Sequence, residues 1–397
     1  MMALDREMVV GVVGAGAMGS GIAQVAASAG HRVVLADANA GATAKARASI
    51  EKAMEREIAK GRLTRDAAND LVGRIDAKAE PIGDDLSAFA ACGLVIEAIV
   101  EDLGAKQTLF RKLESAVSPD AVLATNTSSL SVASVASACA KSERVIGLHF
   151  FNPAPVLPLV EVVPWLGVDQ SLMPAAHALM KQWGKMPVYA SDTPGFIVNR
   201  IARPFYGESI RILEEGIADA PTIDWAMKEL GGFRMGPFEL MDFIGNDVNY
   251  AVTRSVFESF FYDPRYKPSL TQRRLVEAGF LGKKSGRGYY DYRGGATMPA
   301  PTKDLVVGRQ VFERVLAMLI NEAADAVLMR VASPADIDLA MTKGVNYPKG
   351  LLAWAEEIGA ATVLGWLEAL QDEYGEDRYR PSPMLKRVAR SGAGFFT

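Results

Sequence analysis

The chain has 397 residues, of which 49% are hydrophobic and 23% are charged, and its formal net charge is −4. These values are typical of a globular protein with two or three domains, and the negative charge argues against generic binding to nucleic acid or to an anionic membrane surface. Because Cys92 and Cys139 lack a C-x-x-C spacing and no apolar run reaches roughly 18 residues, we expect a cytoplasmic protein without a disulfide, metal site, membrane span or targeting segment.

The first half of the chain alternates predicted strands with predicted helices. An apolar run at residues 9–13 predicts a buried strand, a glycine-rich turn follows, and a helix is expected to continue to about residue 29. Two charged stretches, at residues 40–61 and 64–73, predict a helical hairpin inserted into this domain. Further strands are predicted at residues 32–37, 94–99, 121–125, 145–150, 158–163 and 186–190. This alternation is typical of an α/β Rossmann-type sheet that is doubly wound and mostly parallel.

The turn between the first strand and the first helix carries the pattern G-x-G-x-x-G, at Gly14, Gly16 and Gly19. Gly14 would permit the tight turn, Gly16 the close approach of a pyrophosphate, and Gly19 close packing of the helix on the strand. The pattern by itself also fits an ordinary glycine turn, but the flanking strand and helix favour a dinucleotide site. Asp37, which ends the second strand, would bind the ribose hydroxyls and repel a 2′-phosphate, so NAD is favoured over NADP.

A run of hydroxyl side chains at residues 125–130 follows one of the predicted strands. Open α/β sheets bind their ligands at the carboxyl edge, where this run is expected to lie. One of these hydroxyls could cap a helix, and a second could hydrogen-bond a substrate oxygen. The residues alone leave both interpretations open.

His149 ends one apolar run, and Glu161 interrupts another twelve positions later. The proline-rich segment between them, residues 152–158, could fold the two runs back beside one another. A carboxylate buried among valines is costly unless a charged or hydrogen-bonding group meets it, and His149 is the obvious partner. Together they would form an acid/base pair, whereas a lone histidine here would more often be a core residue. His31 and His177 are expected to face solvent.

The pattern becomes helical near Pro194, and Asn199 follows about one turn into the helix. Asn199 would lie near the seam between two domains, where pockets commonly form. The alternative is a structural asparagine that satisfies backbone groups at this junction.

The C-terminal half contains an internal repeat. Residues 223–227 match residues 337–341 at a shift of 114 positions, and a linker is predicted at residues 292–301 between the two copies. We therefore expect three domains, the last of them a degenerate copy of the second: a nucleotide-binding α/β domain at residues 1–192 and two repeated all-α domains at residues 193–294 and 300–397.

The chain resembles the L-3-hydroxyacyl-CoA dehydrogenases in several segments that together cover essentially its whole length. These segments are residues 14–24, 126–130, 147–153, 159–162, 194–200, 236–240 and 281–290. The resemblance implies an NAD-dependent enzyme that oxidises an (S)-3-hydroxyacyl-CoA to the 3-oxoacyl-CoA, in fatty-acid or phenylacetate degradation.

The resemblance also implies a role for each matching residue. His149 would be the general base and Glu161 its orienting partner. Ser128 would hydrogen-bond the 3-oxygen, and Asn199 would position the substrate and the histidine. The remaining matches are contacts to NAD (Gly14, Gly16, Ala17, Met18, Gly19, Asp37, Glu101, Lys106 and Asn126) and to the acyl-CoA (Arg56, Lys60, Ser128 and Asn152). Without the resemblance, the helix face with Arg56 and Lys60 would be an ordinary solvated surface.

The chain departs from the family pattern in two places. Leu157 and Pro158 stand where many relatives have Met-Lys, so any contribution from that lysine is lost. Single-module relatives dimerise through the helical domain, whereas this chain carries a second copy that lacks a counterpart to Asn199. We expect the second copy to be non-catalytic and to act as an internal pseudo-dimer partner, in a chain that is a monomer or a homodimer.

The duplicated module, with residues 347–354, looks like the phenylacetate-pathway type and suggests 3-hydroxyadipyl-CoA as substrate, with 3-hydroxybutyryl-CoA close behind. Two alternatives remain. A non-catalytic NAD-binding or structural relative is disfavoured by the intact set of Ser128, His149, Glu161 and Asn199. A dehydrogenase of a CoA-free hydroxy acid would be separated by a test of CoA dependence.

Overall fold

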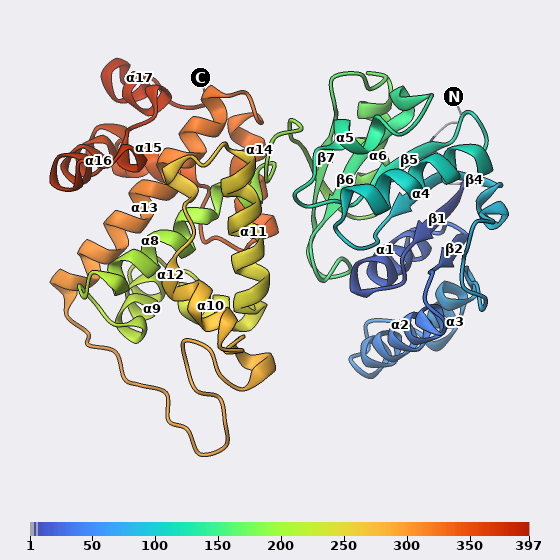
Figure 1. Cartoon of the computed structure of the whole chain (residues 1–397), viewed down its shortest axis with the longest axis horizontal. Coiled ribbons are helices and arrows are strands. Elements are labelled where there is room, and N and C mark those ends of the chain that lie inside the picture. Colours follow the sequence, from blue (N-terminus) through green and yellow to red (C-terminus); the bar gives the residue numbers. More distant parts are fainter. Residues whose placement is uncertain (1–3, 5–6, 397) are drawn as a thin grey trace. The chain divides into compact units, whose positions relative to one another are not determined.

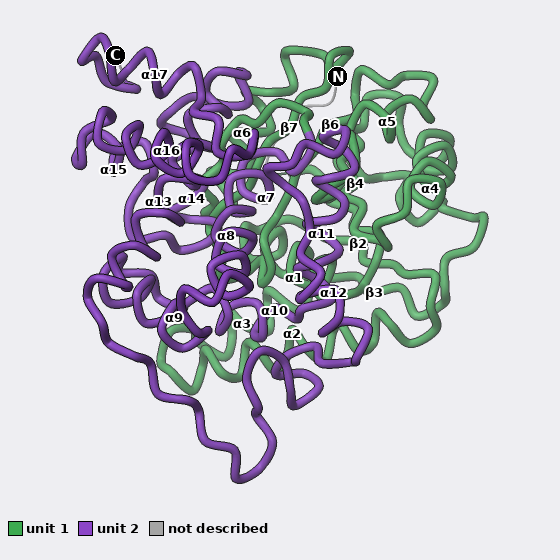
Figure 2. Tube along the Cα trace, turned by 60° about the vertical axis from the view of Figure 1, so that its left-hand side comes forward, with its two compact units in different colours: residues 1–193 green, residues 194–397 purple. Residues whose placement is uncertain are grey.

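The structure, a computed structural model, describes residue 4 and residues 7–396 of the chain. The chain forms two compact units, residues 1–193 and residues 194–397, which Figure 2 shows in different colours. The first unit combines a sheet with helices, and the second is built of helices (Figure 1). The predicted fold class is therefore confirmed.

Within the described residues, the first unit contains one eight-stranded sheet in the order β3-β2-β1-β4-β5-β6-β7-β8. Neighbouring strands are parallel, except that β6 and β7 are antiparallel. The strands are β1 (Val9–Val13), β2 (Val33–Ala36), β3 (Ile75–Ala77), β4 (Cys92–Glu97), β5 (Val122–Thr125), β6 (Val145–Phe150), β7 (Leu159–Val163) and β8 (Met186–Tyr189). The sequence predicted all of them to within two residues at each end, except β3, whose three residues are too few to show an alternating pattern.

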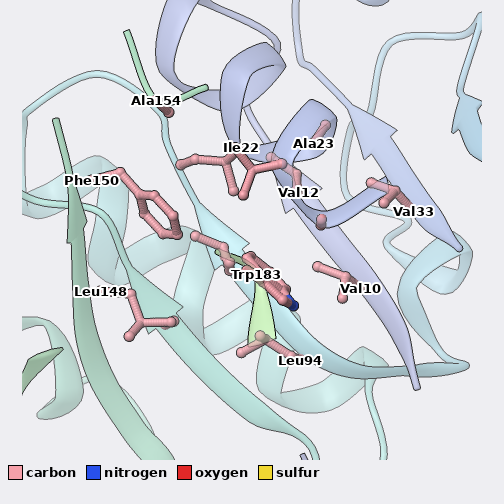
Figure 3. Close-up of a cluster of buried hydrophobic side chains, with 14 of the residues drawn as sticks. Val10, Val12, Ile22, Ala23, Val33, Leu94, Leu148, Phe150, Ala154 and Trp183 are labelled. Carbon is pink, nitrogen blue, oxygen red and sulfur yellow. The ribbon is translucent and has the colours of Figure 1, made fainter. Parts of the chain in front are cut away.

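Helices cover both faces of this sheet. They are α1 (Ala17–Ser28), α2 (Ala42–Ala59), α3 (Arg65–Gly73), α4 (Leu103–Ala116), α5 (Val132–Ala136) and α6 (Leu172–Gln182), with short 3₁₀ turns η1 (Ser87–Phe89) and η2 (Ser142–Arg144). The core against α1 and α6 contains Val10, Val12, Ile22 and Trp183 (Figure 3), and the core against α4 and α5 contains Val13. Successive side chains of a strand point to opposite faces, so a continuous apolar run such as β1 is expected where both faces are covered.

The predicted exposure of His31 is wrong. His31 is 2% exposed, its Nδ1 lies 3.2 Å from the carbonyl oxygen of Met8, and its ring lies 5.5 Å from that of Trp183. The turn after α1 is polar in sequence, but this histidine packs inward onto the indole. His177 is partly buried, because its ring stacks on Tyr189 at 4.8 Å.

The second unit begins with the short helix α7 (Val198–Ile201). The other helices are α8 (Arg203–Glu214), α9 (Ala220–Glu229), α10 (Pro237–Ile244), α11 (Asn246–Ser259), α12 (Leu270–Glu277), α13 (Leu305–Leu328), α14 (Pro334–Gly344), α15 (Leu351–Ile358), α16 (Ala360–Tyr374) and α17 (Pro383–Ser391), with 3₁₀ turns η3 (Pro264–Tyr266), η4 (Lys283–Ser285) and η5 (Asp377–Tyr379). None of the helices described is both long enough and apolar enough to cross a membrane.

The internal repeat has the same local structure in both copies. Asp224 on α9 accepts hydrogen bonds from two backbone N–H groups at the start of α10, at 2.8 and 2.9 Å. Asp338 on α14 accepts the equivalent two from the start of α15, both at 2.9 Å. At Gly236 and Gly350 a Cβ atom would collide with these carboxylates, so glycine is required at both positions. Each aspartate thus fixes the angle between two consecutive helices.

The two copies pack against one another through α13. This helix contacts α8 and α9 of the first copy, and every residue from 314 to 326 is buried. A helix that is buried on all sides needs apolar or paired side chains around its whole circumference. The segment 314–326 consists of apolar residues and of polar residues that have partners. The second copy therefore covers apolar surface of the first.

Deletion of residues 300–397 should expose the faces of α8 and α9 that α13 covers, because the buried side chains of these two helices are largely apolar and Glu208 of α8 would lose its partner Arg314. We expect the truncated chain to dimerise or aggregate in size-exclusion chromatography with light scattering. The intact chain at the same concentration is the control. A truncated chain that remains a monodisperse monomer would contradict this view of the second copy.

Candidate active site

The carboxyl ends of β1, β4 and β5 lie side by side at one edge of the sheet. Val13 is paired with Glu97, and Glu97 with Thr125, in the parallel ladder. The segments that follow these three strands carry most of the cofactor residues predicted from the sequence, together with Ser128. Open α/β sheets bind their ligands at this edge.

The glycine turn after β1 has the geometry of a dinucleotide site. Gly14 has a φ of 101°, and a Cβ there would fall against the backbone that follows β4. A Cβ at Gly19 would collide with the carbonyl of Gly14. In contrast, nothing lies within 4 Å of a Cβ built on Gly16, the N-cap of α1, which makes no side-chain cap. The start of α1 therefore has open space at Gly16, which fits the close approach of a pyrophosphate to the first N–H groups of this helix.

Asp37 lies beside this turn. One of its carboxylate oxygens accepts from the N–H of Ala15 at 2.6 Å, and the other accepts from the backbone and side-chain N–H groups of Asn39 at 2.7 and 2.9 Å. These bonds hold the carboxylate against the glycine turn. A carboxylate has about four acceptor positions, so capacity remains for a ribose hydroxyl. The contact of Asp37 with ribose stays a prediction.

A buried ion cluster follows β4. The Lys106 Nζ lies 2.6 Å from Glu97 and 3.1 Å from Glu101, and the side chains of Lys106 and Glu97 are 1% and 0% exposed. Glu97 was missed in the sequence, although a glutamate that ends an apolar strand resembles the signal that identified Glu161. In this arrangement Lys106 supports Glu101, and a direct contact of Lys106 with NAD stays a prediction.

Glu101 organises the hydroxyl-rich segment after β5. One of its oxygens accepts from the Thr127 hydroxyl at 2.6 Å, from the Ser128 N–H at 2.9 Å and from the Ser129 N–H at 3.1 Å. Burial alone would raise the pKa of Glu101, but the Lys106 ammonium and these hydrogen bonds outweigh it and lower the pKa to about 2. Glu101 is therefore ionised at neutral pH and fixes the backbone that carries Ser128.

The two interpretations of this hydroxyl segment can now be separated. The N-cap of α5 is Ser131, which accepts from the Ser134 N–H, so none of residues 125–130 caps that helix. The Asn126 side-chain oxygen accepts from the Phe150 N–H at 2.8 Å and ties the segment to the end of β6. This bond connects the Ser128 segment to the strand that carries His149. Contacts of Asn126 and Ser128 with ligands stay predictions.

His149 and Glu161 are directly opposite one another in the antiparallel pair of β6 and β7. The His149 Nδ1 lies 2.6 Å from Glu161 Oε2, and both side chains are buried. Opposite residues of an antiparallel pair project from the same face, so this register alone brings the two groups together. The turn predicted between them does fold the two strands back.

The pairing with Glu161 also determines which nitrogen of His149 can act as a base. A carboxylate accepts the Nδ1–H, so the neutral imidazole carries its lone pair on Nε2. That nitrogen can take a proton from a hydroxyl group, and the carboxylate stabilises the imidazolium that results. His149 can therefore act as a general base, and the Glu161 carboxylate can orient its imidazole ring.

Lys185, just before β8, holds the connection between β6 and β7. It is buried, and its ammonium donates to the carbonyl oxygens of Ala154 and, at 3.0 Å, of Leu157. Burial lowers the pKa of Lys185 to about 8, so the charged form still predominates at neutral pH. No sequence pattern indicates this role of Lys185, because its two acceptors are backbone groups about 30 positions earlier in the chain.

Four further residues predicted from the sequence lie outside the strand ends described above. Asn152 is exposed in the connection that Lys185 holds. Arg56 and Lys60 lie at the exposed C-terminal end of α2, where Lys60 Nζ is 2.9 Å from Glu57. Asn199 lies in the second unit on α7, and its carbonyl oxygen accepts from Arg203 Nε at 2.8 Å. No cluster of metal-binding side chains occurs among the residues that the structure describes.

Comparison with known proteins identifies both units. The family model for the 3-hydroxyacyl-CoA dehydrogenase NAD-binding domain matches residues 9–193. The model for the C-terminal domain of the same family matches twice, at residues 195–292 and at residues 311–394.

Individual relatives agree. The chain is 39% identical to the 3-hydroxyadipyl-CoA dehydrogenase of Escherichia coli K12, over 97% of this chain and 98% of the relative. It is 40% identical to the human mitochondrial hydroxyacyl-coenzyme A dehydrogenase, over 72% of this chain and 91% of the relative. A crystal structure described as 3-hydroxybutyryl-CoA dehydrogenase from E. coli K12 superposes with a TM-score of 0.91 at 38% identity, covering 97% of this chain and 99% of that one.

Replacement of Lys185 by methionine removes the ammonium but keeps most of the side-chain volume. Because hydrogen bonds from a charged donor contribute about 1.5–3 kcal/mol, we expect a lower melting temperature, and a fall of about tenfold in kcat/KM as the segment between His149 and Glu161 loosens. Lys181→Met, at an exposed position on α6, is the control. Wild-type stability and kcat/KM in the Lys185→Met variant would show that this anchor is dispensable.

Proposed function

Because the chain belongs to the 3-hydroxyacyl-CoA dehydrogenase family, we propose that it oxidises 3-hydroxyadipyl-CoA, with 3-hydroxybutyryl-CoA as the second candidate substrate. The reaction class follows from the family: the protein is an NAD-dependent oxidoreductase that acts on the CH–OH group of a 3-hydroxyacyl-CoA. The proposal concerns the acyl chain and the residues that carry out the reaction.

The share of this chain that each relative matches supports 3-hydroxyadipyl-CoA as the substrate. The relative named 3-hydroxyadipyl-CoA dehydrogenase aligns over 97% of this chain and therefore includes the duplicated helical module. Relatives named hydroxyacyl-CoA or 3-hydroxybutyryl-CoA dehydrogenase align over 71–74% of it. The full-length match to a structure described as a 3-hydroxybutyryl-CoA dehydrogenase favours the second candidate.

The observation that carries the proposed mechanism is the 2.6 Å contact between His149 and Glu161. NAD supplies the hydride acceptor for C3 when it is bound. His149 Nε2 removes the proton of the 3-hydroxyl group as the C3–H bond breaks, and Glu161 stabilises the imidazolium. Ser128, which Glu101 holds in place, donates a hydrogen bond to the 3-oxygen. Asn199 positions the substrate.

Further assignments belong to the same proposal. Lys60 and Arg56 contact the phosphates of CoA, for which their exposed cationic groups are suited. The domains are residues 1–192, 193–294 and 300–397, and the repeated match of the C-terminal family model supports the last boundary. The working unit is a monomer with an internal pseudo-dimer, or a homodimer of such chains, and its location is the cytoplasm.

Replacement of His149 by glutamine should remove the base while keeping a polar side chain of similar size. We expect kcat to fall by about 10²–10⁴-fold, the usual contribution of general base catalysis, whereas the dissociation constant of NAD should change little. Glu161→Gln should reduce kcat less than His149→Gln, because the imidazole remains. Formation of NADH, followed by absorbance, measures the rate, and calorimetry measures NAD binding. A His149→Gln variant with more than a tenth of the wild-type kcat would contradict the assignment.

The acyl chain is tested by the kinetics of four substrates: 3-hydroxybutyryl-CoA, 3-hydroxyhexanoyl-CoA, 3-hydroxyadipyl-CoA and free 3-hydroxyadipate. We expect the highest kcat/KM with 3-hydroxyadipyl-CoA, by about tenfold over the C4 substrate, since a site that binds a carboxylate discriminates against chains that lack one. The free acid should be the poorest substrate. A preference for 3-hydroxybutyryl-CoA would select the second candidate instead.

A further inference from the structure

The two helical copies meet through two ion clusters that the internal repeat relates to one another. Arg200 of the first copy donates to Glu322 of the second, and Arg314 of the second copy donates to Glu208 of the first at 2.7 Å. Both the arginines and the glutamates are 114 positions apart, the same shift as in the sequence repeat. The exchange of partners is that of a two-fold symmetric dimer interface, here formed within one chain.

Each of the two glutamates also accepts from a tyrosine, and each cluster contains further charged groups: Arg265 contacts Glu322 and Asp325 in the first, and Glu215 accepts from Arg314 in the second. The Tyr266 hydroxyl donates to Glu322 at 2.5 Å, and the Tyr379 hydroxyl donates to Glu208 at 2.5 Å. All four charged side chains of the two pairs are buried. Because a buried charge that loses its partner is strongly destabilising, each cluster fixes the backbone on both sides of the internal interface.

The arginines of the two clusters lie in different surroundings. Arg200 directly follows Asn199 on α7, a helix of only four residues that packs against α13 and α14 of the second copy. Asp325 of the second copy also accepts from Arg200, at 3.1 Å. The counterpart, Arg314, lies inside the long helix α13 and follows Glu313 at the position that corresponds to Asn199. Only the first cluster therefore adjoins a predicted substrate residue.

A four-residue helix has too few internal hydrogen bonds to be stable by itself. From its own copy, Arg203 binds the Asn199 carbonyl oxygen at 2.8 Å, and the Arg203 guanidinium donates to Thr253 at 3.0 Å. The charged contacts to the next residue, Arg200, come from the second copy. Side chains of the second copy thus hold Arg200, the residue next to Asn199.

We propose that Glu322 of the second helical copy is a positioning residue, which acts through Arg200 to orient Asn199 for catalysis. This role rests on the proposed function of Asn199. It gives the second helical copy a part in the reaction. The equivalent cluster around Glu208 has no such part.

The internal symmetry provides a matched control. Glu322→Gln and Glu208→Gln each replace a buried carboxylate by an amide of the same shape, in clusters that the repeat relates to one another, so both variants are expected to have a lower melting temperature than wild type. Glu322 contacts two arginines and Glu208 one, so kcat and not stability separates the two variants. Only Glu322→Gln should lower kcat for the 3-hydroxyacyl-CoA, by about tenfold or more, because small misplacements of a positioning group are costly. Glu208→Gln should keep kcat within about twofold of wild type, and neither variant should alter the KM for NAD. Equal effects of both variants on kcat, or no effect of Glu322→Gln, would overturn the proposal.

If either glutamine variant fails to fold, Tyr266→Phe and Tyr379→Phe form a milder matched pair that removes one hydroxyl from each cluster. The expected order is the same, with the larger fall in kcat for Tyr266→Phe, and equal kcat values would overturn the proposal.

A double-mutant cycle separates this inference from the proposed function. If Glu322 acts through Asn199, Glu322→Gln should have no further effect on kcat in the Asn199→Ala background. Full additivity would overturn the positioning role while leaving the role of Asn199 intact. Wild-type kcat in Asn199→Ala alone would instead refute the catalytic assignment of Asn199 itself.

Discussion

The antiparallel pairing of β6 with β7 is the constraint on which the active site depends. Glu161 is buried between valines, and only a strand in this direction and register places a hydrogen-bonding group opposite it. A slip of one residue would turn Glu161 to the other face of the sheet. Gly147 contributes to the register, because a Cβ there would collide with Val163 on β7 and with Val132. The proposed catalytic pair of His149 and Glu161 is thus a consequence of strand geometry.

The same electrostatic requirement organises the neighbouring edge of the sheet. Glu97 and Lys106 are buried, and each is tolerated because the other is present. The second contact of Lys106 holds Glu101, which in turn binds the backbone of Ser128. A chain of charged contacts therefore leads from the interior of the sheet to the segment that carries Ser128, the proposed contact of the substrate oxygen. Such a chain fixes position without requiring a long rigid loop.

The sequence predicted those features that depend on residues close together in the chain. Apolar runs predicted the strands, the glycine spacing predicted the turn at α1, and the isolated Glu161 predicted a buried partner for His149. It was not informative where the partner is distant. Lys185 binds backbone oxygens that have no side-chain signature, and His31 is buried because of Trp183, about 150 positions later. Polarity patterns describe the neighbourhood along the chain, and these contacts arise only in the folded unit.

The helical repeat separates residues that both copies retain from Asn199, the proposed substrate residue, which only one copy has. Asp224 and Gly236 have the counterparts Asp338 and Gly350, with the same hydrogen bonds, because both copies need the same helix angle. Glu313 stands in the second copy at the position that corresponds to Asn199, although the adjacent arginine is present in both copies. A group that stabilises an interface is needed on both sides of a two-fold arrangement, whereas a group that binds substrate is needed only where a nucleotide-binding domain precedes it. Fusion of the two copies into one chain allows this difference, since each copy can then change its sequence independently of the other.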